Sequence, residues 1–267
     1  MDNTQQPTLE PIHSTFSSSK IPLVLIYNGF DSAKTWEQVL PHLPQWVEPM
    51  VYDREGYGTR FSKTHFREPV DLVREGVEEL DQVIEQNLGT SQPILIWGHC
   101  IGAAMGLVWA AKHPSRVKAV VAEAPGFFSN EELADKSEWL LNKQRTLPEK
   151  FVQHFEFMHG EGTASVIWDR ICSHRSSYII NPSYTILPQI NNLSVPVLIL
   201  QGTRDIYFDP EHAQVGADVM KQARIEVIHK GSHDLHLDDP KGITSRVNRF
   251  FASVVKTDST TPSLDLS

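Results

Sequence analysis

The stretch Trp97–Ala103, WGHCIGA, follows the apolar run PILIW at 93–97 and carries a cysteine between two glycines. Glycines two residues before and after Cys100 remove side chains that would collide in a sharp strand-to-helix turn. Ala103 and Ala104 would let the following helix lie close to the strand. We therefore predict that Cys100 stands at the tip of such a turn, above a helix N-terminus that favours a thiolate. A small thiol packed in the interior is the alternative.

Short apolar runs and longer stretches of helical periodicity alternate along the chain. The expected strands span 22–27, 49–53, 93–97, 117–123, 195–201 and 224–229, and the expected helices span 70–86, 102–113, 210–221 and 242–255. Each expected strand is apolar on both faces, as in strands that helices cover on both sides. The pattern predicts an α/β fold with a doubly wound, mostly parallel sheet.

A long interval without strand-like runs interrupts this alternation between Ala124 and Asn192. Its sequence is compatible with helices and rich in aromatic residues. We expect a core formed by residues 20–126 and 193–256, with a helical lid inserted at 127–192. The polar ends of the chain, 1–19 and 257–267, are expected to be disordered.

Two further side chains follow expected strands and complete a catalytic pattern with Cys100. Asp205 comes just after the strand at 195–201, in QGTRDIYF, and His233 comes after the strand at 224–229, in KGSHDLHLDDP. The carboxyl ends of parallel strands share one edge of the sheet, so these loops should meet the Cys100 turn. The chain order nucleophile, acid, histidine predicts that Cys100 attacks, His233 takes its proton, and Asp205 fixes the imidazole tautomer.

Each of the two partners of Cys100 has a rival nearby in the sequence. Glu123 ends the strand at 117–123 and could be the acid, but the Gly-x-x-Asp turn at Asp205 matches better. His236 lies three residues after His233 and could be the base, although the sequence pattern favours His233. His99 is interpreted as a side chain packed under the turn.

An oxyanion site is expected where the first strand ends, in YNGFDSAKTW at 27–36. Gly29 would let the backbone turn so that the Phe30 N–H faces the nucleophile, and the Ile101 N–H would be the second donor. Two backbone donors aimed at a developing oxyanion are what acyl chemistry needs. A simple turn at Asn28–Gly29 is the alternative.

These segments, together with YDREGYG at 52–58 and HPSRVKAVVAEAP at 113–125, resemble the α/β-hydrolase superfamily in its lidded branch. The resemblance runs from about Ile21 to Val255 and implies Cys100, Asp205 and His233 as the triad. The family usually has serine at position 100 and His-Gly at Asn28–Gly29. Cysteine at this turn resembles dienelactone hydrolases and polyhydroxyalkanoate synthases, and an engineered Ser→Cys substitution is the alternative.

The resulting functional hypothesis is a hydrolase that cleaves an ester, thioester or lactone of a small apolar acyl compound through a Cys100 acyl-enzyme. Aromatic residues of the expected lid would contact the substrate, namely Phe127, Phe128, Trp139, Phe155 and Trp168. About half of them could instead be core. The alternatives are an acyltransferase or cyclase on the same fold, and a receptor-like homologue that binds a ligand.

Composition narrows the expected partners and location. The formal net charge is −9 and no basic cluster tracks a phosphate backbone, which argues against nucleic acid and anionic membranes. The sequence shows neither a signal peptide nor an apolar run of membrane-spanning length, so a cytoplasmic protein is expected. We expect no cofactor and no metal, since the pair Cys172 and His174 lacks further ligands. A carrier-protein partner is possible, but no motif supports it.

Overall fold

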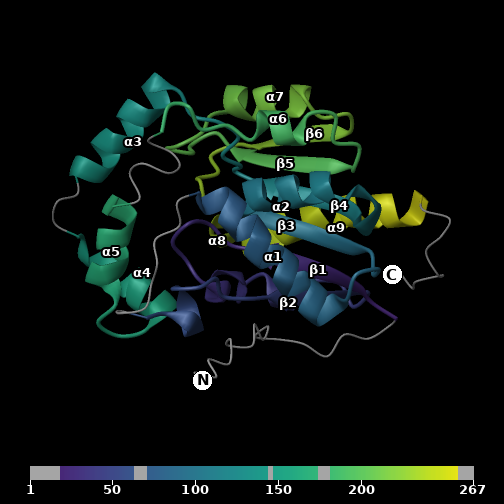
Figure 1. Ribbon diagram of the computed structural model, residues 1–267, viewed down its shortest axis with the longest axis horizontal. Helices are drawn as coiled ribbons and strands as arrows, with labels where there is room; N and C mark the ends of the chain where they lie inside the picture. Colours follow the sequence, from purple (N-terminus) through teal and green to yellow (C-terminus); the bar gives the residue numbers. More distant parts are fainter. Residues whose placement is uncertain (1–18, 63–70, 144–146, 174–180, 258–267) are drawn as a thin grey trace, which may run out of the picture.

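The computed structural model describes residues 19–62, 71–143, 147–173 and 181–257 (Figure 1). Its six strands form one sheet in the order β2-β1-β3-β4-β5-β6, and every pairing between neighbours is parallel. The strands are β1 (Ile21–Ile26), β2 (Val47–Val51), β3 (Ile94–His99), β4 (Val117–Glu123), β5 (Val197–Gly202) and β6 (Ala223–Ile228). The predicted α/β class and parallel sheet are therefore confirmed.

Helices follow the strands, as the alternation predicts. The α-helices are α1 (Leu72–Leu88), α2 (Ile101–Lys112), α3 (Glu131–Lys143), α4 (Glu149–His159), α5 (Ala164–Ser173), α6 (Leu187–Ile190), α7 (Pro210–Asp218), α8 (Leu235–Asp238) and α9 (Pro240–Thr257). In the described residues, the 3₁₀ turns η1 (Ala33–Trp36), η2 (Leu40–His42), η3 (Gly58–Arg60) and η4 (Pro114–Arg116) lie in the connections. Asp71 and Asp209 cap α1 and α7, because their side chains accept the N–H of Arg74 and His212.

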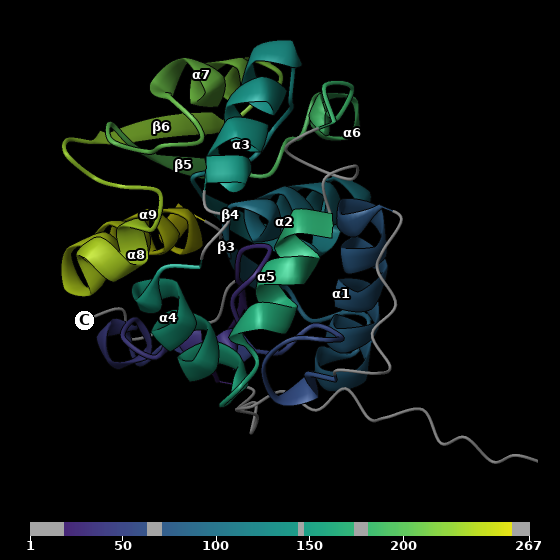
Figure 2. The ribbon, with the colours of Figure 1, turned by 90° about the vertical axis from the view of Figure 1, so that its left-hand side faces the viewer.

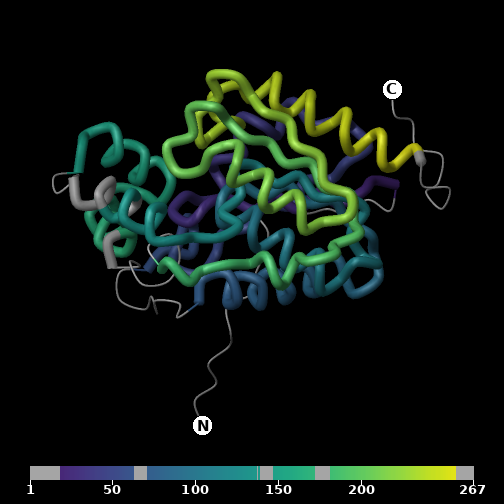
Figure 3. The backbone as a smooth tube through the Cα atoms, turned by 90° about the horizontal axis from the view of Figure 1, so that it is seen from above, coloured from purple at the N-terminus to yellow at the C-terminus, as the bar shows by residue number. Residues whose placement is uncertain are grey.

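Two hydrophobic layers enclose the sheet. Val24 and Ile26 of β1 point into a cluster shared with α1 and α2, and Leu23 and Leu25 point into a cluster shared with α9. This alternation follows from the two-residue repeat of a strand. Viewed from above, the sheet runs between α1 and α2 on one side and α9 on the other (Figure 3). Because both faces are covered, β1 and β3 are buried along their whole length, whereas the edge strand β6, with Arg224 and Glu226, is only partly buried.

The connection between β4 and β5 holds the helices α3, α4 and α5, which we call the inserted helices. They group at one end of the sheet, and Figure 2 shows them in front of it. Phe155 and Ile167, from α4 and α5, pack with Tyr27 and Tyr57 of the core. This packing places α4 over the loops that follow β1 and β2.

The two chain ends fall largely outside the described residues. The predictions of disorder at 1–19 and 257–267 concern residues 1–18 and 258–267, which are not described, and α9 extends to Thr257. Among the helices that the structure describes, none is long and apolar enough to cross a bilayer.

Candidate active site

Cys100 occupies a strained turn between β3 and α2. Its φ is 54° and its ψ is −118°, in a region that residues with a side chain rarely adopt. The Cys100 N–H donates to the Glu123 carbonyl over 2.8 Å, which ties the turn to β4. The residue is 6% exposed. The thiol therefore lies at the carboxyl end of β3 and at the N-terminus of α2.

The flanking glycines are required by close backbone contacts. A Cβ on Gly98 would lie 2.5 Å from the Gly102 carbonyl oxygen, and a Cβ on Gly102 would lie 2.4 Å from the carbonyl oxygens of Ile26 and Tyr27. Real Cβ atoms do not approach backbone so closely. The structure thus leaves no room for a Cβ at Gly98 or Gly102, as the Gly98-x-Cys100-x-Gly102 spacing predicts.

His233 connects Cys100 to Asp205. Nδ1 of His233 lies 2.9 Å from Oδ2 of Asp205, and Cys100 lies close enough to His233 for its side chain to raise the pKa of the imidazole. Asp205 is itself held by three donors: the N–H groups of Tyr207 at 2.8 Å and Phe208 at 3.1 Å bind Oδ1, and Gln201 Nε2 binds Oδ2 at 3.0 Å. The structure therefore brings the three predicted residues together from the ends of β3, β5 and β6.

The surroundings of Asp205 and His233 favour the carboxylate form of the acid and the protonated form of the imidazole. Burial would raise the pKa of Asp205, but the hydrogen bond and charge of His233 lower it below its ordinary value. Burial would lower the pKa of His233, but Cys100 and Asp205 together raise it well above its ordinary value. An imidazole whose pKa is raised in this way is suited to accept a proton from a neighbouring group.

His99 supports the backbone of the loop that carries His233. Its Nε2 donates to the His233 carbonyl oxygen over 3.1 Å, and its ring lies 4.9 Å from the His233 ring. Burial lowers the pKa of His99 to about 4, so the ring is neutral at pH 7. This agrees with the interpretation of His99 as a side chain packed under the turn.

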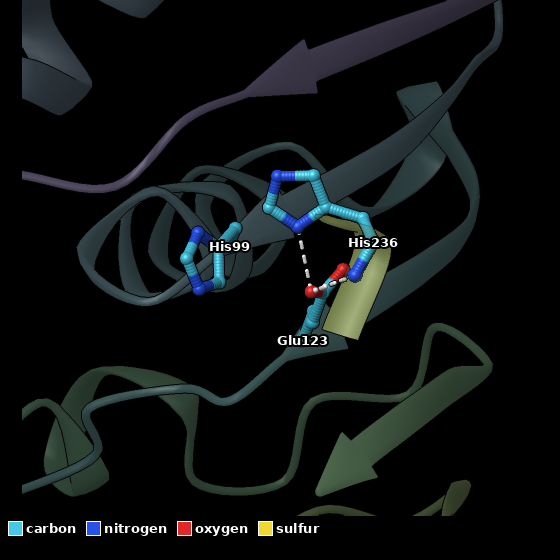
Figure 4. A group of neighbouring side chains, drawn as sticks. All are labelled: His99, Glu123 and His236. Carbon is cyan, nitrogen blue, oxygen red and sulfur yellow. Dashed lines mark hydrogen bonds and ion pairs between the residues drawn. The ribbon is translucent and has the colours of Figure 1, made fainter. Parts of the chain in front are cut away.

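The rival acid and the rival base are bonded to each other. His236 Nδ1 lies 2.7 Å from Oε1 of Glu123, and the His236 N–H donates to the same oxygen over 2.9 Å (Figure 4). Trp97 Nε1 donates to Oε2 over 3.0 Å. Burial would raise the pKa of Glu123, but the charge and hydrogen bonds of His236 lower it to about 2. Glu123 and His236 form a satisfied internal pair next to the Asp205–His233 pair.

His99, Glu123 and His236 also offer a possible set of metal ligands, because their ligand atoms lie within 4.8 Å of one another. All three residues are fully buried, and the Glu123 carboxylate already accepts three N–H groups. Cation binding would have to break these bonds without water to replace them. We therefore interpret the trio as structural.

The two expected oxyanion donors differ in their surroundings. Ile101 is the first residue of α2, so its N–H has no partner within the helix. The Phe30 N–H donates to Asn28 Oδ1 over 2.8 Å. The expected role of Gly29 is wrong in one respect: Gly29 has no positive φ, and a Cβ there would lie 3.7 Å from Ile101 Cγ2, an ordinary contact. The turn at this position does not require glycine.

The five aromatic residues expected to contact the substrate lie in different surroundings. Phe127 is fully buried, with its ring against α7 at the position of Gly216; this prediction needs correction, because such a ring offers no free surface. Phe155 is buried between α4, α5 and the core, and Trp168 packs against the same cluster. Phe128 is half-buried and stacks on His212. The side chain of Trp139 lies outside the described part of the chain.

Three polar side chains near the triad were missed by the sequence analysis. Burial raises the pKa of Tyr184 well above its ordinary value and also raises the pKa of Tyr207, whose ring lies 4.8 Å from the His233 ring. Gln201 binds Asp205. The position of Tyr207, two residues after Asp205, could have indicated its role. Tyr184 gave no such signal, since its segment precedes β5 without a motif.

The family of hydrolases described as serine aminopeptidase, S33, matches residues 23–240. The chain belongs to this family. The description of the family names a serine, whereas this chain has a cysteine, Cys100, at the turn between β3 and α2. The predicted resemblance to the α/β-hydrolase superfamily is therefore confirmed, and the cysteine nucleophile stays a prediction.

Individual relatives of this S33-family chain are distant. It is 23% identical over 254 residues to a protein of Bacillus subtilis (strain 168) named "uncharacterized carboxylesterase nap", covering 86% of the chain and 79% of the relative. It is 22% identical over 264 residues to monoacylglycerol lipase ABHD6 of Mus musculus, covering 89% and 77%.

Solved structures show the same fold. An α/β hydrolase from a Medee basin deep-sea metagenome library matches with a TM-score of 0.70 and 19% identity, over 90% of this chain and 92% of that one. A thermophilic esterase from Thermogutta terrifontis matches with a TM-score of 0.64 and 16% identity, over 88% and 91%. At such identities the likeness concerns the fold alone.

Proposed function

We propose that the protein is an esterase or thioesterase that forms an acyl-enzyme on Cys100. The observation that carries the proposal is the connection of Cys100 to His233 and of His233 to Asp205 at the carboxyl edge of the sheet. A nucleophile on a strained turn, a base within hydrogen-bond reach and a buried acid behind the base are the parts that acyl transfer needs.

The reaction uses these residues in two steps. Cys100 Sγ attacks the acyl carbonyl carbon while His233 takes the thiol proton; the C–S bond forms, the bond to the leaving oxygen or sulfur breaks, and His233 protonates that leaving group. Water then attacks the thioester carbon and gives a proton to His233. The C–S bond breaks, the acid leaves, and the proton returns to Cys100. Asp205 stabilises the imidazolium in both steps.

The Ile101 N–H is the ready oxyanion donor in this scheme, and the Phe30 N–H is the second. We assign the inserted helices as a lid over the site, held to the core where Phe155 and Trp168 pack with Tyr27 and Tyr57. The aromatic content of these helices favours a small apolar acyl group. The named relatives, a carboxylesterase and a monoacylglycerol lipase, support ester substrates.

Hydrolysis of p-nitrophenyl acetate, butyrate and octanoate, and of phenyl thioacetate, tests the proposal. We expect turnover by the wild type, with a preference for the short acyl chains, and a loss of at least about 10³-fold in Cys100→Ala. Cys172→Ala is the matched control and should keep full activity. Turnover that survives in Cys100→Ala would refute the proposal. Product analysis with an added alcohol separates hydrolysis from acyl transfer.

A further inference from the structure

The side chain of Asn28 closes the loop in which the second oxyanion donor lies. Asn28 Oδ1 accepts the N–H of Phe30 over 2.8 Å and the N–H of Asp31 over 2.9 Å. Asn28 Nδ2 donates to Asp31 Oδ2 over 2.7 Å. The Phe30 N–H is thus bonded inside its own loop, and the orientation of one amide side chain decides whether it stays so.

Asp31 links this amide to α4 of the inserted helices. The Asp31 side chain is buried, and its Oδ1 lies 2.6 Å from Nε2 of His154. Burial would raise the pKa of Asp31, but the hydrogen bond and charge of His154 lower it. The same bond raises the pKa of His154. His154, Asp31 and Asn28 therefore form a continuous chain of charged and polar bonds that ends on the Phe30 N–H.

A second histidine of α4 holds the other side of the same residue. His159 Nε2 donates to the Phe30 carbonyl oxygen over 2.8 Å, and its Nδ1 accepts the Gly58 N–H over 2.9 Å. Lys34 also reaches α4, since its Nζ donates to the Phe157 carbonyl over 2.8 Å. Residues of α4 thus hold both backbone groups of Phe30. His159 binds the carbonyl oxygen directly, and His154 acts on the N–H through Asp31 and Asn28.

We propose that Asn28, Asp31 and His154 are positioning residues that set the availability of the Phe30 N–H to the acyl group. With His154 on Asp31, Asn28 keeps the N–H bonded and the oxyanion site has the Ile101 N–H alone. When His154 no longer binds Oδ1 of Asp31, the Asp31 carboxylate can turn away from Asn28 Nδ2, the Asn28 amide is released, and the Phe30 N–H becomes available to the site. The inference rests on the proposed function, because it assigns Phe30 to the oxyanion site of that reaction.

The chemistry of Cys100 provides a test that separates oxyanion binding from thiol reactivity. Acylation by p-nitrophenyl acetate develops charge on a carbonyl oxygen, whereas alkylation by iodoacetamide does not. One oxyanion donor changes the rate of acyl transfer by about 10²- to 10³-fold. The rate of acylation divided by the rate of alkylation therefore measures the contribution of the oxyanion donors. A change in the reactivity of the thiol, or in access to it, affects both rates and cancels in this ratio.

The variants are His154→Leu, which removes the bond to Asp31, and His154→Gln, whose amide can keep it. Lys34→Met is the matched control, since it loses a contact with α4 but leaves Asn28 and Asp31 untouched. In His154→Leu we expect the ratio of acylation to alkylation to rise by at least about tenfold. We expect His154→Gln to stay near the wild type and Lys34→Met to leave the ratio unchanged.

Amide hydrogen exchange measured by NMR tests the same inference without any substrate. In His154→Leu the Phe30 amide should exchange at least about tenfold faster than in the wild type, and the Ala33 amide, bonded to Asp53 Oδ1, should not change. Unchanged Phe30 exchange, or a ratio of rates that stays level or falls, would overturn the inference. If neither the wild type nor any variant forms an acyl adduct, the proposed function fails. The exchange rate of the Phe30 amide then decides by itself whether His154 controls the Phe30 N–H.

Discussion

His236 Nδ1 lies 2.7 Å from Glu123 Oε1, so the two residues that competed with the triad in the sequence are bonded to each other. His236 Nε2 lies 3.0 Å from Thr35 Oγ1, while His233 Nδ1 lies 2.9 Å from Asp205 Oδ2. The structure thus holds two carboxylate–imidazole pairs, and the His99 ring lies 4.9 Å from the imidazole of each; the pair of Asp205 and His233 is the one we assign to Cys100.

Glu123→Gln tests the structural role of the inner pair. The change replaces a carboxylate that accepts three N–H groups with an amide whose NH₂ end faces one of those donors, so we expect a loss of about 1–3 kcal/mol in the free energy of unfolding. Urea denaturation measures this loss. Glu37→Gln, at an exposed position, is the control and should cost less than about 0.5 kcal/mol. Equal stability of the two variants would contradict the pairing.

Gly98→Ala tests the crowding at the Cys100 turn. A Cβ 2.5 Å from the Gly102 carbonyl should destabilise the protein by more than about 3 kcal/mol or prevent folding. Gly29→Ala meets only an ordinary contact and should cost less than about 1 kcal/mol. Thermal unfolding of both proteins checks the difference, and a stable Gly98→Ala variant would show that the turn is wider than described.

His212→Gln tests a pH dependence of stability. Burial lowers the pKa of His212 to about 4, so below its ordinary value of 6.5 the unfolded chain takes up the proton first. Stability should therefore fall as the pH drops from 6.5 to 4, by up to about 3 kcal/mol from this residue. Glutamine can still accept the Phe127 N–H but does not titrate.

The urea midpoint measured at pH 7 and at pH 4 checks this prediction. His212→Gln should lose less stability between these pH values than the wild type. His229→Gln, at an exposed position, should lose as much as the wild type. The same loss in all three proteins would contradict a neutral His212 in the folded state.

Asp205→Asn tests the role of the buried acid. The change keeps the side-chain shape but removes the charge that orients and stabilises the His233 imidazolium, so we expect kcat to fall by about 10³- to 10⁴-fold. The kinetics of p-nitrophenyl ester hydrolysis measure the effect, and circular dichroism confirms that the variant folds. A fall of less than tenfold would show that another acid serves His233.

Much of this architecture could be predicted because its signals are local. Apolar runs predict the positions of the six strands, and the glycines around Cys100 predict a turn where a Cβ has no room. That Cys100, Asp205 and His233 lie together follows from the rule that parallel strands end at one edge of the sheet. These patterns depend on residues close together in the sequence or on the geometry common to parallel sheets.

What could not be predicted depends on contacts between distant segments. The Glu123–His236 pair and the His154–Asp31 bond join residues far apart in the chain, and their types alone do not indicate a partner. Phe127 looked suited to a substrate site, but its neighbours on α7 make it core. The amide of Asn28 could have been expected to close a turn, yet its bond to the Phe30 N–H emerges from the folded loop.

The central claim is that Cys100 is the nucleophile, and the intact mass of the protein tests it most directly. The protein is mixed briefly with p-nitrophenyl butyrate, quenched with acid and weighed. We expect a mass increment of one butyryl group on the wild type and on Cys172→Ala, and none on Cys100→Ala. An increment that persists in Cys100→Ala, or ester turnover with no adduct on Cys100 at any quench time, would contradict the claim.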